Sequence, residues 1–318
     1  MSVTTGKLRV VFGDLNLGVY AGDLHANFAY NICGLSSLVK GGREWIYRAP
    51  KPTFWRATTD NDRGSSFQLK SGMWLSADMF IKNTGIEVTR DGVQLDNFLP
   101  PMNNVYTNEE YADELTITYH HETITVPAAK VDVTYTVTAD GRIRVACKYF
   151  GTQGLPQLPV FGLRFVMPTM AEGFTYEGLS GETYPDRKAG GKMGVYEVKG
   201  LPVTPYLVPQ ECGMHVDTKW VKVTRGTVLS NIGRDLPATS LTIEAADKPF
   251  AFSCLPYTAE ELENAYHHEE LPPARRTVLC VLGAVRGVGG IDSWGSDVEE
   301  AYHVSAEQDH EFSFNIAL

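Results

Sequence analysis

Hydrophobic and polar positions alternate with a period of two along most of this chain. In residues 131–138 three valines and a tyrosine fall on one face and polar residues on the other, which is the pattern of a half-buried β-strand. Asp140-Gly141 follows at once and leads into a second alternating run at 142–147, so the pair predicts a hairpin around a tight turn. Similar runs occur at 115–119, 160–166, 220–223 and 277–281, and at Phe312, Phe314 and Ile316.

Helical signals are few. Thr258 and Glu261 have the spacing of a capping box, in which each side chain accepts a hydrogen bond from the other residue's backbone N–H. This spacing predicts a short helix with Leu262 and Tyr266 on one side. A second short helix is expected over residues 73–80.

Strands and helices do not alternate regularly, as they would in a (β/α)8 barrel or a nucleotide-binding sheet. The turn-rich stretches at 100–101, 151–159 and 181–194 are not long and polar enough to be flexible interdomain linkers, and the sequence has no internal repeat. We therefore expect an all-β fold, a large antiparallel β-sandwich with one or two short helices, formed by residues 1–318 as a single domain.

Composition allows a large core and excludes some partners. Of the 318 residues 43% are hydrophobic, and 38 acidic against 28 basic residues give a net charge of −10. This charge repels a phosphate backbone, and no cluster of lysine or arginine offsets it, so neither nucleic acid nor an anionic membrane is an expected partner. No stretch has the length of a membrane span, and the alternating residues 8–12 leave no room for a signal peptide before them.

The cysteines indicate a reducing compartment. They are odd in number, widely spaced, and lack the short pairings that bind zinc. We expect reduced thiols, mostly in the core, of a cytoplasmic protein. The five are Cys33, Cys147, Cys212, Cys254 and Cys280.

A dense polar run at residues 54–64 is the first candidate site. Two aromatic residues, two arginines, two aspartates and an asparagine crowd into it, and an amphipathic loop at 65–72 follows. Polar groups packed this closely either satisfy one another in a buried network or point at a ligand. The candidates are Arg56, Asp60, Asn61, Asp62, Arg63 and Gly64.

Other polar segments carry weaker signals. The turns at 184–187 and 209–213 each combine a proline, which sets the backbone, with charged residues placed for a buried salt link, and we expect them to lock neighbouring strands. Histidine pairs at 120–121 and 267–268 do not predict a metal site, because adjacent residues on a strand point to opposite faces and no acidic residue stands at ligand spacing. The chain has no G-x-S-x-G motif and no phosphate-binding loop.

Residues 288–297 place Trp294 among glycine, aspartate and serine, so its indole is expected on a tight loop. An indole on such a loop offers a flat apolar face and an N–H donor, which suit a sugar ring. The alternative is an indole that covers the edge of the core.

Four separated segments together resemble the C-terminal domain of the large β-galactosidases of glycoside hydrolase family 2, a β-supersandwich related to galactose mutarotases. The likeness covers nearly the whole chain, and the segments, which occur in the same order in both, are Arg56–Asp62, Tyr184–Arg187, Pro209–Glu211 and Gly289–Trp294. A chain that starts at this domain resembles the small subunit of the heterodimeric β-galactosidases of lactic-acid and related bacteria. One departure is Cys212, where the family more often has asparagine.

The resemblance implies that Trp294 contacts the galactosyl substrate and that residues 64–72 form a mobile loop beside the active site. Retaining glycosidases need two carboxylates, usually at the ends of barrel strands, and no barrel is expected here. We therefore assign no catalytic residue, cofactor or metal to this chain. A separate large subunit is expected to carry the catalytic barrel, with any magnesium or sodium ion, and to share a pocket for β-galactosides such as lactose with this chain.

Two other functions stay open. The first is a stand-alone enzyme resembling an aldose 1-epimerase, which needs an acid and a base across one sugar, and His215, His303 and Glu307 are available for these roles. The second is a carbohydrate-binding module, which binds galactosides without any partner.

Overall fold

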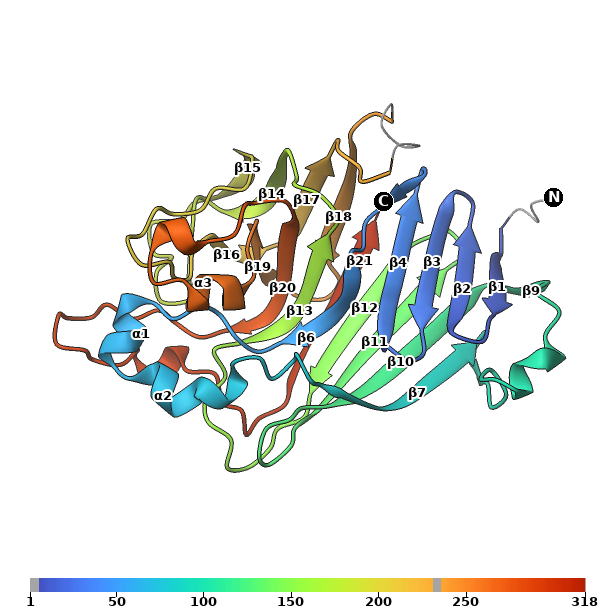
Figure 1. Ribbon diagram of the computed structural model, residues 1–318, viewed down its shortest axis with the longest axis horizontal. Helices are drawn as coiled ribbons and strands as arrows, with labels where there is room; N and C mark the ends of the chain where they lie inside the picture. The colour runs from blue at the N-terminus through green and yellow to red at the C-terminus, as the bar shows by residue number, and fades with distance from the viewer. Residues whose placement is uncertain (1–5, 231–235, 318) are drawn as a thin grey trace.

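The computed structural model describes residues 6–230 and 236–317, and its regular structure is mostly antiparallel β-sheet. Figure 1 shows one long sheet running through the molecule, with a smaller sheet packed over each half of it. The long sheet has ten strands and the smaller ones have six and five. This arrangement confirms the predicted all-β antiparallel sandwich.

The strands of each sheet come from distant parts of the chain. The ten-stranded sheet contains, in spatial order, β15 (Met193–Lys199), β14 (Gly173–Leu179), β17 (Trp220–Arg225), β18 (Thr239–Ala245), β21 (His310–Ala317), β12 (Ile143–Tyr149), β11 (Lys130–Thr138), β10 (Glu114–Glu122), β7 (Lys82–Arg90) and β8 (Val93–Gln94). The six-stranded sheet contains β5 (Arg43–Glu44), β4 (Gly34–Lys40), β3 (Leu24–Ala29), β2 (Asn16–Ala21), β1 (Leu8–Phe12) and β9 (Glu110–Ala112). The five-stranded sheet contains β16 (Met214–Thr218), β19 (Phe250–Leu255), β20 (Thr277–Val285), β13 (Val160–Met167) and β6 (Arg48–Thr53).

The predicted hairpin forms at β11 and β12. Alternate residues of β11 are buried, as the period of two requires, and Val137 pairs with Ile143 across the turn. Gly141 has a φ of 83°, a left-handed conformation that glycine adopts without steric cost. All the other predicted runs also lie in strands: 115–119 in β10, 160–166 in β13, 220–223 in β17, 277–281 in β20 and 312–316 in β21.

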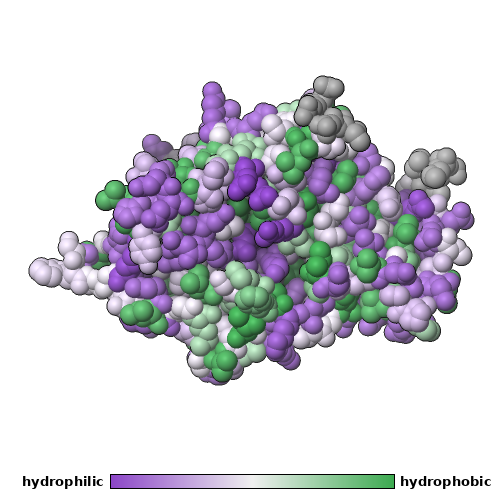
Figure 2. Space-filling view, in the orientation of Figure 1, coloured by the Kyte–Doolittle hydropathy of each residue, from purple (hydrophilic) through white to green (hydrophobic). Residues whose placement is uncertain are grey.

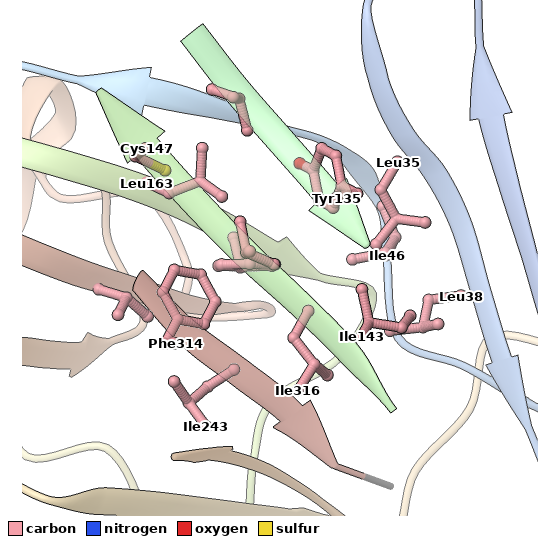
Figure 3. Packing of buried hydrophobic residues seen from close by; sticks show 14 of the residues in the cluster. Leu35, Leu38, Ile46, Tyr135, Ile143, Cys147, Leu163, Ile243, Phe314 and Ile316 are labelled. Atoms are coloured by element: carbon pink, nitrogen blue, oxygen red, sulfur yellow. The ribbon is translucent and has the colours of Figure 1, made fainter. Parts of the chain in front are cut away.

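The core lies between the long sheet and its two covers. Figure 3 shows Leu35 and Leu38 of β4 meeting Tyr135 of β11, Ile143 of β12 and Ile316 of β21 in one interior. Each of these residues is at most 1% exposed. Burying an aliphatic or aromatic side chain of this size contributes about 1.5–3 kcal/mol to stability, so this packing holds the six-stranded sheet against the ten-stranded one.

One of the predicted helices forms and the other does not. Thr258 caps α3 (Ala259–Asn264) in a capping box with Glu261, as predicted, and Leu262 is buried. The prediction for Tyr266 was wrong, because the helix ends at Asn264 and the tyrosine ring is 76% exposed.

The segment after β6 differs from both expectations for it. Residues 60–71 fold into two short helices, α1 (Asp60–Gly64) and α2 (Phe67–Ser71), although 65–72 was expected to be a loop. Residues 73–80, expected to be a helix, are instead a 3-10 turn and further turns. Ser76 with its φ of 60° interrupts any helix there.

In the part of the chain that the structure describes, the 3-10 turns are η1 (Gly72–Trp74), η2 (Met102–Val105), η4 (His268–Glu270) and η5 (Glu300–Tyr302).

All five cysteines are free, as expected. Cys212 is fully buried in an apolar cluster with Ala57, Leu255 and Leu262, and burial raises the pKa of its thiol to about 12. The residue therefore packs as a small hydrophobic side chain. Across the described ranges, no helix is long and apolar enough to span a membrane.

Candidate functional site

A buried ion pair joins the end of the polar run to its beginning. Thr59 caps α1 in a capping box with Asp62, which turns the aspartate back toward Arg56. The two guanidinium nitrogens of Arg56 lie 2.5 and 3.2 Å from the two carboxylate oxygens of Asp62. Burial opposes ionisation of Asp62, but the charge of Arg56 and hydrogen bonds from Arg56 and Thr59 hold its pKa below the usual range. The geometry is bidentate, which is the strongest form of this pair.

A second buried arginine extends the pair toward the tryptophan loop. Arg286, directly after β20, donates at 3.3 Å to Oδ1 of Asp62, which also accepts from Arg56, and it pairs with Asp297. Its guanidinium lies 3.9 Å from the centre of the Phe67 ring in α2. Arg56 meanwhile donates to the carbonyl oxygen of Gly287 at 2.9 Å. The network therefore ties α1 and α2 to both ends of the loop that carries Trp294.

The turn at residues 184–187 binds the same loop. The Asp186 carboxylate accepts the backbone N–H groups of Val288, at 3.0 and 3.1 Å, and of Gly289, at 2.8 Å. Arg187 donates to the carbonyl oxygen of Gly289. The expected salt link between Asp186 and Arg187 was wrong, because both side chains bind the loop backbone instead. A carboxylate that accepts several backbone N–H groups fixes a turn without any regular structure.

The turn at residues 209–213 binds α1 from the other side. Gln210 accepts the backbone N–H of Asp60 at 3.0 Å and donates to its carboxylate at 3.2 Å. Arg63 donates to the carbonyl oxygen of Pro209 at 3.3 Å. The charged pair expected in this turn was wrong, because Glu211 is its single charged residue. The turn instead holds the first turn of α1 in place.

Glu211 is a buried carboxyl group beneath this network. Burial raises its pKa to about 8, although the positive charge of Arg56 partly opposes the shift. Its Oε1 atom has no hydrogen-bond partner within the described part of the chain. Glu211 is therefore the one acid of this region whose neutral form the fold favours.

The tryptophan itself stands clear of the protein. Trp294 is 93% exposed, so the indole does not cover the core edge. Asp292 orders the loop: its carboxylate accepts the backbone N–H of Trp294 at 2.8 Å and the hydroxyl of Ser296 at 2.6 Å. At the loop's base, Asn61 donates to the carbonyl oxygen of Val288 at 3.2 Å. Figure 1 shows the loop after β20 projecting beside α1 and α2.

Four of the six candidates of the polar run therefore contact the tryptophan loop or the arginine that braces it. Arg56, Asn61 and Asp62 reach the loop or its bracing arginine, and Gly64 packs against Gly295 within it. Asp60 and Arg63 contact the neighbouring 209–213 turn instead. The carboxylates of Asp62, Asp186 and Asp292 all accept hydrogen bonds from the protein. The arrangement can present an aromatic face rigidly, and these three carboxylates hold the loop and α1 in place.

Sequence reasoning missed three residues of this region. Arg286 and Asp297 form the ion pair between the strand end and the loop. Glu263 of α3 accepts the backbone N–H of Thr58 at 2.7 Å and the indole N–H of Trp55 at 3.2 Å, which fixes the strand end before α1. The sequence held one signal for these residues, which is an arginine directly after an apolar strand. A cation in that place is buried and therefore requires a partner of opposite charge.

Only the histidine pair at 120–121 lies on a strand. The expectation of a strand without a nearby acid at 267–268 was wrong, because His267 and His268 lie at the start of η4 and His267 is 3.0 Å from the acid Glu270. His121 is buried and His120 lies on the outer face of β10, so the two point to opposite faces as predicted. His120 lies 2.7 Å from Asp132 and 3.5 Å from Glu87, acids of the neighbouring strands that sequence spacing does not reveal. Within residues 6–230 and 236–317, no group of three histidine, cysteine, aspartate or glutamate side chains is placed to hold a metal ion.

The residues available for epimerase chemistry are engaged in different places. His215 is buried among aromatic rings, and burial lowers its pKa to about 4. His303 contacts the carbonyl oxygen of Val298 at 2.9 Å, and Glu307 accepts the backbone N–H of Gly154 at 2.9 Å. In these contacts His215, His303 and Glu307 have no neighbouring residue in common.

Fold and site define an all-β chain that presents one aromatic loop on a rigid, buried polar base. The family described as beta galactosidase small chain matches residues 20–316. The chain belongs to this family, which confirms the resemblance to a β-galactosidase small subunit.

Relatives agree with the family. The chain is 60% identical over 318 residues to a protein of Latilactobacillus sakei named beta-galactosidase small subunit, and the match covers 100% of both. It is 34% identical to a beta-galactosidase of Halalkalibacterium halodurans and 33% identical to one of Streptococcus thermophilus. These two matches cover 98% and 97% of this chain but only 28% and 27% of the relatives, so the chain spans about a quarter of their length.

Solved structures show a more distant likeness. A galactose mutarotase-like protein of Lactobacillus casei has a TM-score of 0.39 at 11% identity, with 95% of this chain and 99% of that one covered. A galactose mutarotase related enzyme of Lactobacillus acidophilus has a TM-score of 0.38 at 10% identity, with coverages of 98% and 96%.

Proposed function

We propose that the chain is the non-catalytic small subunit of a β-galactosidase and that Trp294 forms one wall of a substrate pocket that a large subunit completes. The observation that carries this proposal is that two distant polar segments, Arg56–Asp62 and Tyr184–Arg187, bind the base of the 287–297 loop, while a third, Pro209–Glu211, braces α1. The Latilactobacillus sakei relative, which matches over its full length, bears the name of a small subunit.

In this proposal the chain's own residues orient substrate and transfer no proton. The exposed indole of Trp294 offers a flat face to the apolar C–H side of a galactosyl ring. Asp292 and the buried arginine network hold that face in one position before substrate arrives, which lowers the ordering cost of binding. The two carboxylates for hydrolysis, and any magnesium or sodium ion, are assigned to the large subunit.

Two further assignments belong to the same proposal. The five free thiols support a reducing compartment, so we place the subunit in the cytoplasm. The large hydrophobic cluster receives side chains from all three sheets, which supports one domain over residues 1–318.

The test is reconstitution. The purified chain is mixed with the large β-galactosidase subunit of the same organism, and hydrolysis of a chromogenic β-galactoside is measured for each chain alone and for the mixture. We expect activity in the mixture and almost none in either chain alone. Appreciable hydrolysis by the isolated chain overturns the proposal.

Two controls address the other functions. Calorimetry of the isolated chain with a galactoside is expected to show no binding, whereas a carbohydrate-binding module binds without a partner. Polarimetry with fresh α-galactose is expected to show the uncatalysed rate of mutarotation, whereas an epimerase accelerates it.

A further inference from the structure

A strip of exposed apolar side chains follows α1 along the chain. Leu69 is 80% exposed and Phe80 is 68% exposed. Within residues 69–80 the only exposed charge is Lys70, since Asp78 is buried in an ion pair with Arg164. We call this strip the 69–80 surface; it consists of Leu69, Met73, Leu75, Met79 and Phe80. Figure 2 shows hydrophobic residues on this face over the region where α2 leads toward β7.

The backbone under the 69–80 surface is firmly anchored. Trp74 is fully buried, stacks on Phe54 with ring centres 5.4 Å apart, and donates its indole N–H to the carbonyl oxygen of Pro156 at 3.0 Å. Phe67 lies buried under the guanidinium of Arg286. The apolar side chains therefore point outward because the other side of the segment is packed in the core. A surface ordered in advance loses little entropy when a partner binds.

The same anchors connect this surface to the tryptophan loop. Arg286 contacts Phe67 of α2 and pairs with Asp297 of the loop. Gly64, at the end of α1, packs against Gly295. Figure 1 shows α1, α2 and the loop after β20 at one end of the molecule. A partner that closes a pocket over Trp294 therefore meets the 69–80 surface as part of the same contact.

We propose that the 69–80 surface is a docking site for the large catalytic subunit, an inference that rests on the proposed function. Its composition is that of an interface core, with methionine, leucine and an aromatic ring and almost no charge. The chain spans only 28% of the length of the Halalkalibacterium halodurans relative, so most of that protein lies outside the part this chain matches. Contact with that remainder removes the exposed apolar area from water.

The test compares two double variants of equal charge change. Leu69→Glu with Phe80→Glu places charge in the 69–80 surface. Val93→Glu with Val195→Glu, at residues 64% and 61% exposed, places the same charge on β8 and β15, the two edge strands of the ten-stranded sheet. All four side chains are largely exposed, so the isolated variants are expected to keep the wild-type thermal unfolding midpoint. Binding to the large β-galactosidase subunit of the same organism is measured by calorimetry.

We expect the Leu69→Glu/Phe80→Glu variant to bind at least about a hundredfold more weakly, since each buried apolar anchor accounts for about tenfold in Kd. The control variant is expected to bind within about threefold of wild type. As a measurement free of substitutions, hydrogen exchange of residues 67–80 in the wild-type chain is expected to slow on mixing with the large subunit.

The other outcomes separate the two proposals. Suppose that wild type and the Leu69→Glu/Phe80→Glu variant bind the large subunit equally well, and that hydrogen exchange at residues 67–80 of wild type does not slow. The docking proposal is then wrong, and the proposed function stands. If wild type does not bind at all, both fail. If the substitutions abolish self-association of the chain and leave the large subunit bound, the surface serves a second copy and the docking proposal is wrong.

Discussion

Gly295 packs so closely against Gly64 that a Cβ at residue 295 would lie 2.6 Å from the Gly64 carbonyl oxygen. Gly295 also has a φ of 84°, which is unfavourable for any residue with a side chain. One glycine is on the tryptophan loop and the other ends α1. This contact sets the distance between the loop and the helix that braces it.

Gly295→Ala is therefore expected to move Trp294 more than it disturbs the fold. The strained φ costs about 1 kcal/mol or more, and displacement of the indole lowers kcat/KM of the assembled enzyme about ten- to a hundredfold. Gly190→Ala is the matched control, because a Cβ at residue 190 meets nothing within 4 Å. Equal kcat/KM for the two variants would show that the close contact does not position the loop.

Trp294→Ala isolates the role of the indole. Because the side chain is 93% exposed, the substitution is expected to leave thermal unfolding and assembly unchanged. The assembled enzyme is expected to lose about 1–3 kcal/mol of transition-state stabilisation, read from kcat/KM. Tyr266→Ala removes another exposed aromatic ring as a control. Unchanged kcat/KM removes Trp294 from the substrate site, and loss of assembly assigns it to the interface instead.

Asp62→Asn leaves two buried arginines without their shared carboxylate. The expected loss is about 3–5 kcal/mol in the free energy of unfolding by urea, whereas Asp60→Asn, at an exposed residue, changes it by about 1 kcal/mol or less. Because the folded-state pKa of Asp62 lies below the unfolded value, its stabilisation is present at neutral pH and is lost as pH falls below about 4. Equal losses for the two variants would contradict the buried network.

Glu211→Gln tests a change of stability with pH that is opposite in sign to that of Asp62. Burial raises the folded-state pKa of Glu211 to about 8, so between its unfolded pKa and pH 8 the folded state holds a proton that the unfolded state has released. The wild-type chain therefore loses stability through this residue as pH rises. The variant is expected to match wild type near pH 4 and to gain about 1.4 kcal/mol over it for each pH unit up to about 8. A constant difference between the two unfolding curves would show that Glu211 is ionised in the folded state.

The sequence is a good guide to the strands because their signal is local. A period of two, as in residues 131–138, specifies both a strand and its buried face. Pairing partners are not local, so the contact of β12 with β21 and the flanking of His120 by Asp132 and Glu87 have no signature in spacing. Burial of Trp74 and Ala77 has helical spacing, but the helix expected at residues 73–80 does not form because Ser76 has a left-handed φ of 60°.

Within the site, the sequence indicated which residues take part better than it indicated which residues contact each other. Asp186 and Arg187 are adjacent and opposite in charge, which suggested a pair, yet each binds the backbone at 288–289. Arg286 was missed for the same reason: its partners Asp62 and Asp297 meet it only in the folded chain. The grouping of four segments around one loop came from resemblance, and the hydrogen bonds give its physical basis.

The position of β21 limits when the chain can fold. This strand pairs with β12 on one side and β18 on the other, in the middle of the ten-stranded sheet. Until residues 310–317 have left the ribosome, the sheet is two separate pieces with open inner edges. Such edges pair readily with other chains, so the chain is most prone to aggregate before β21 is in place.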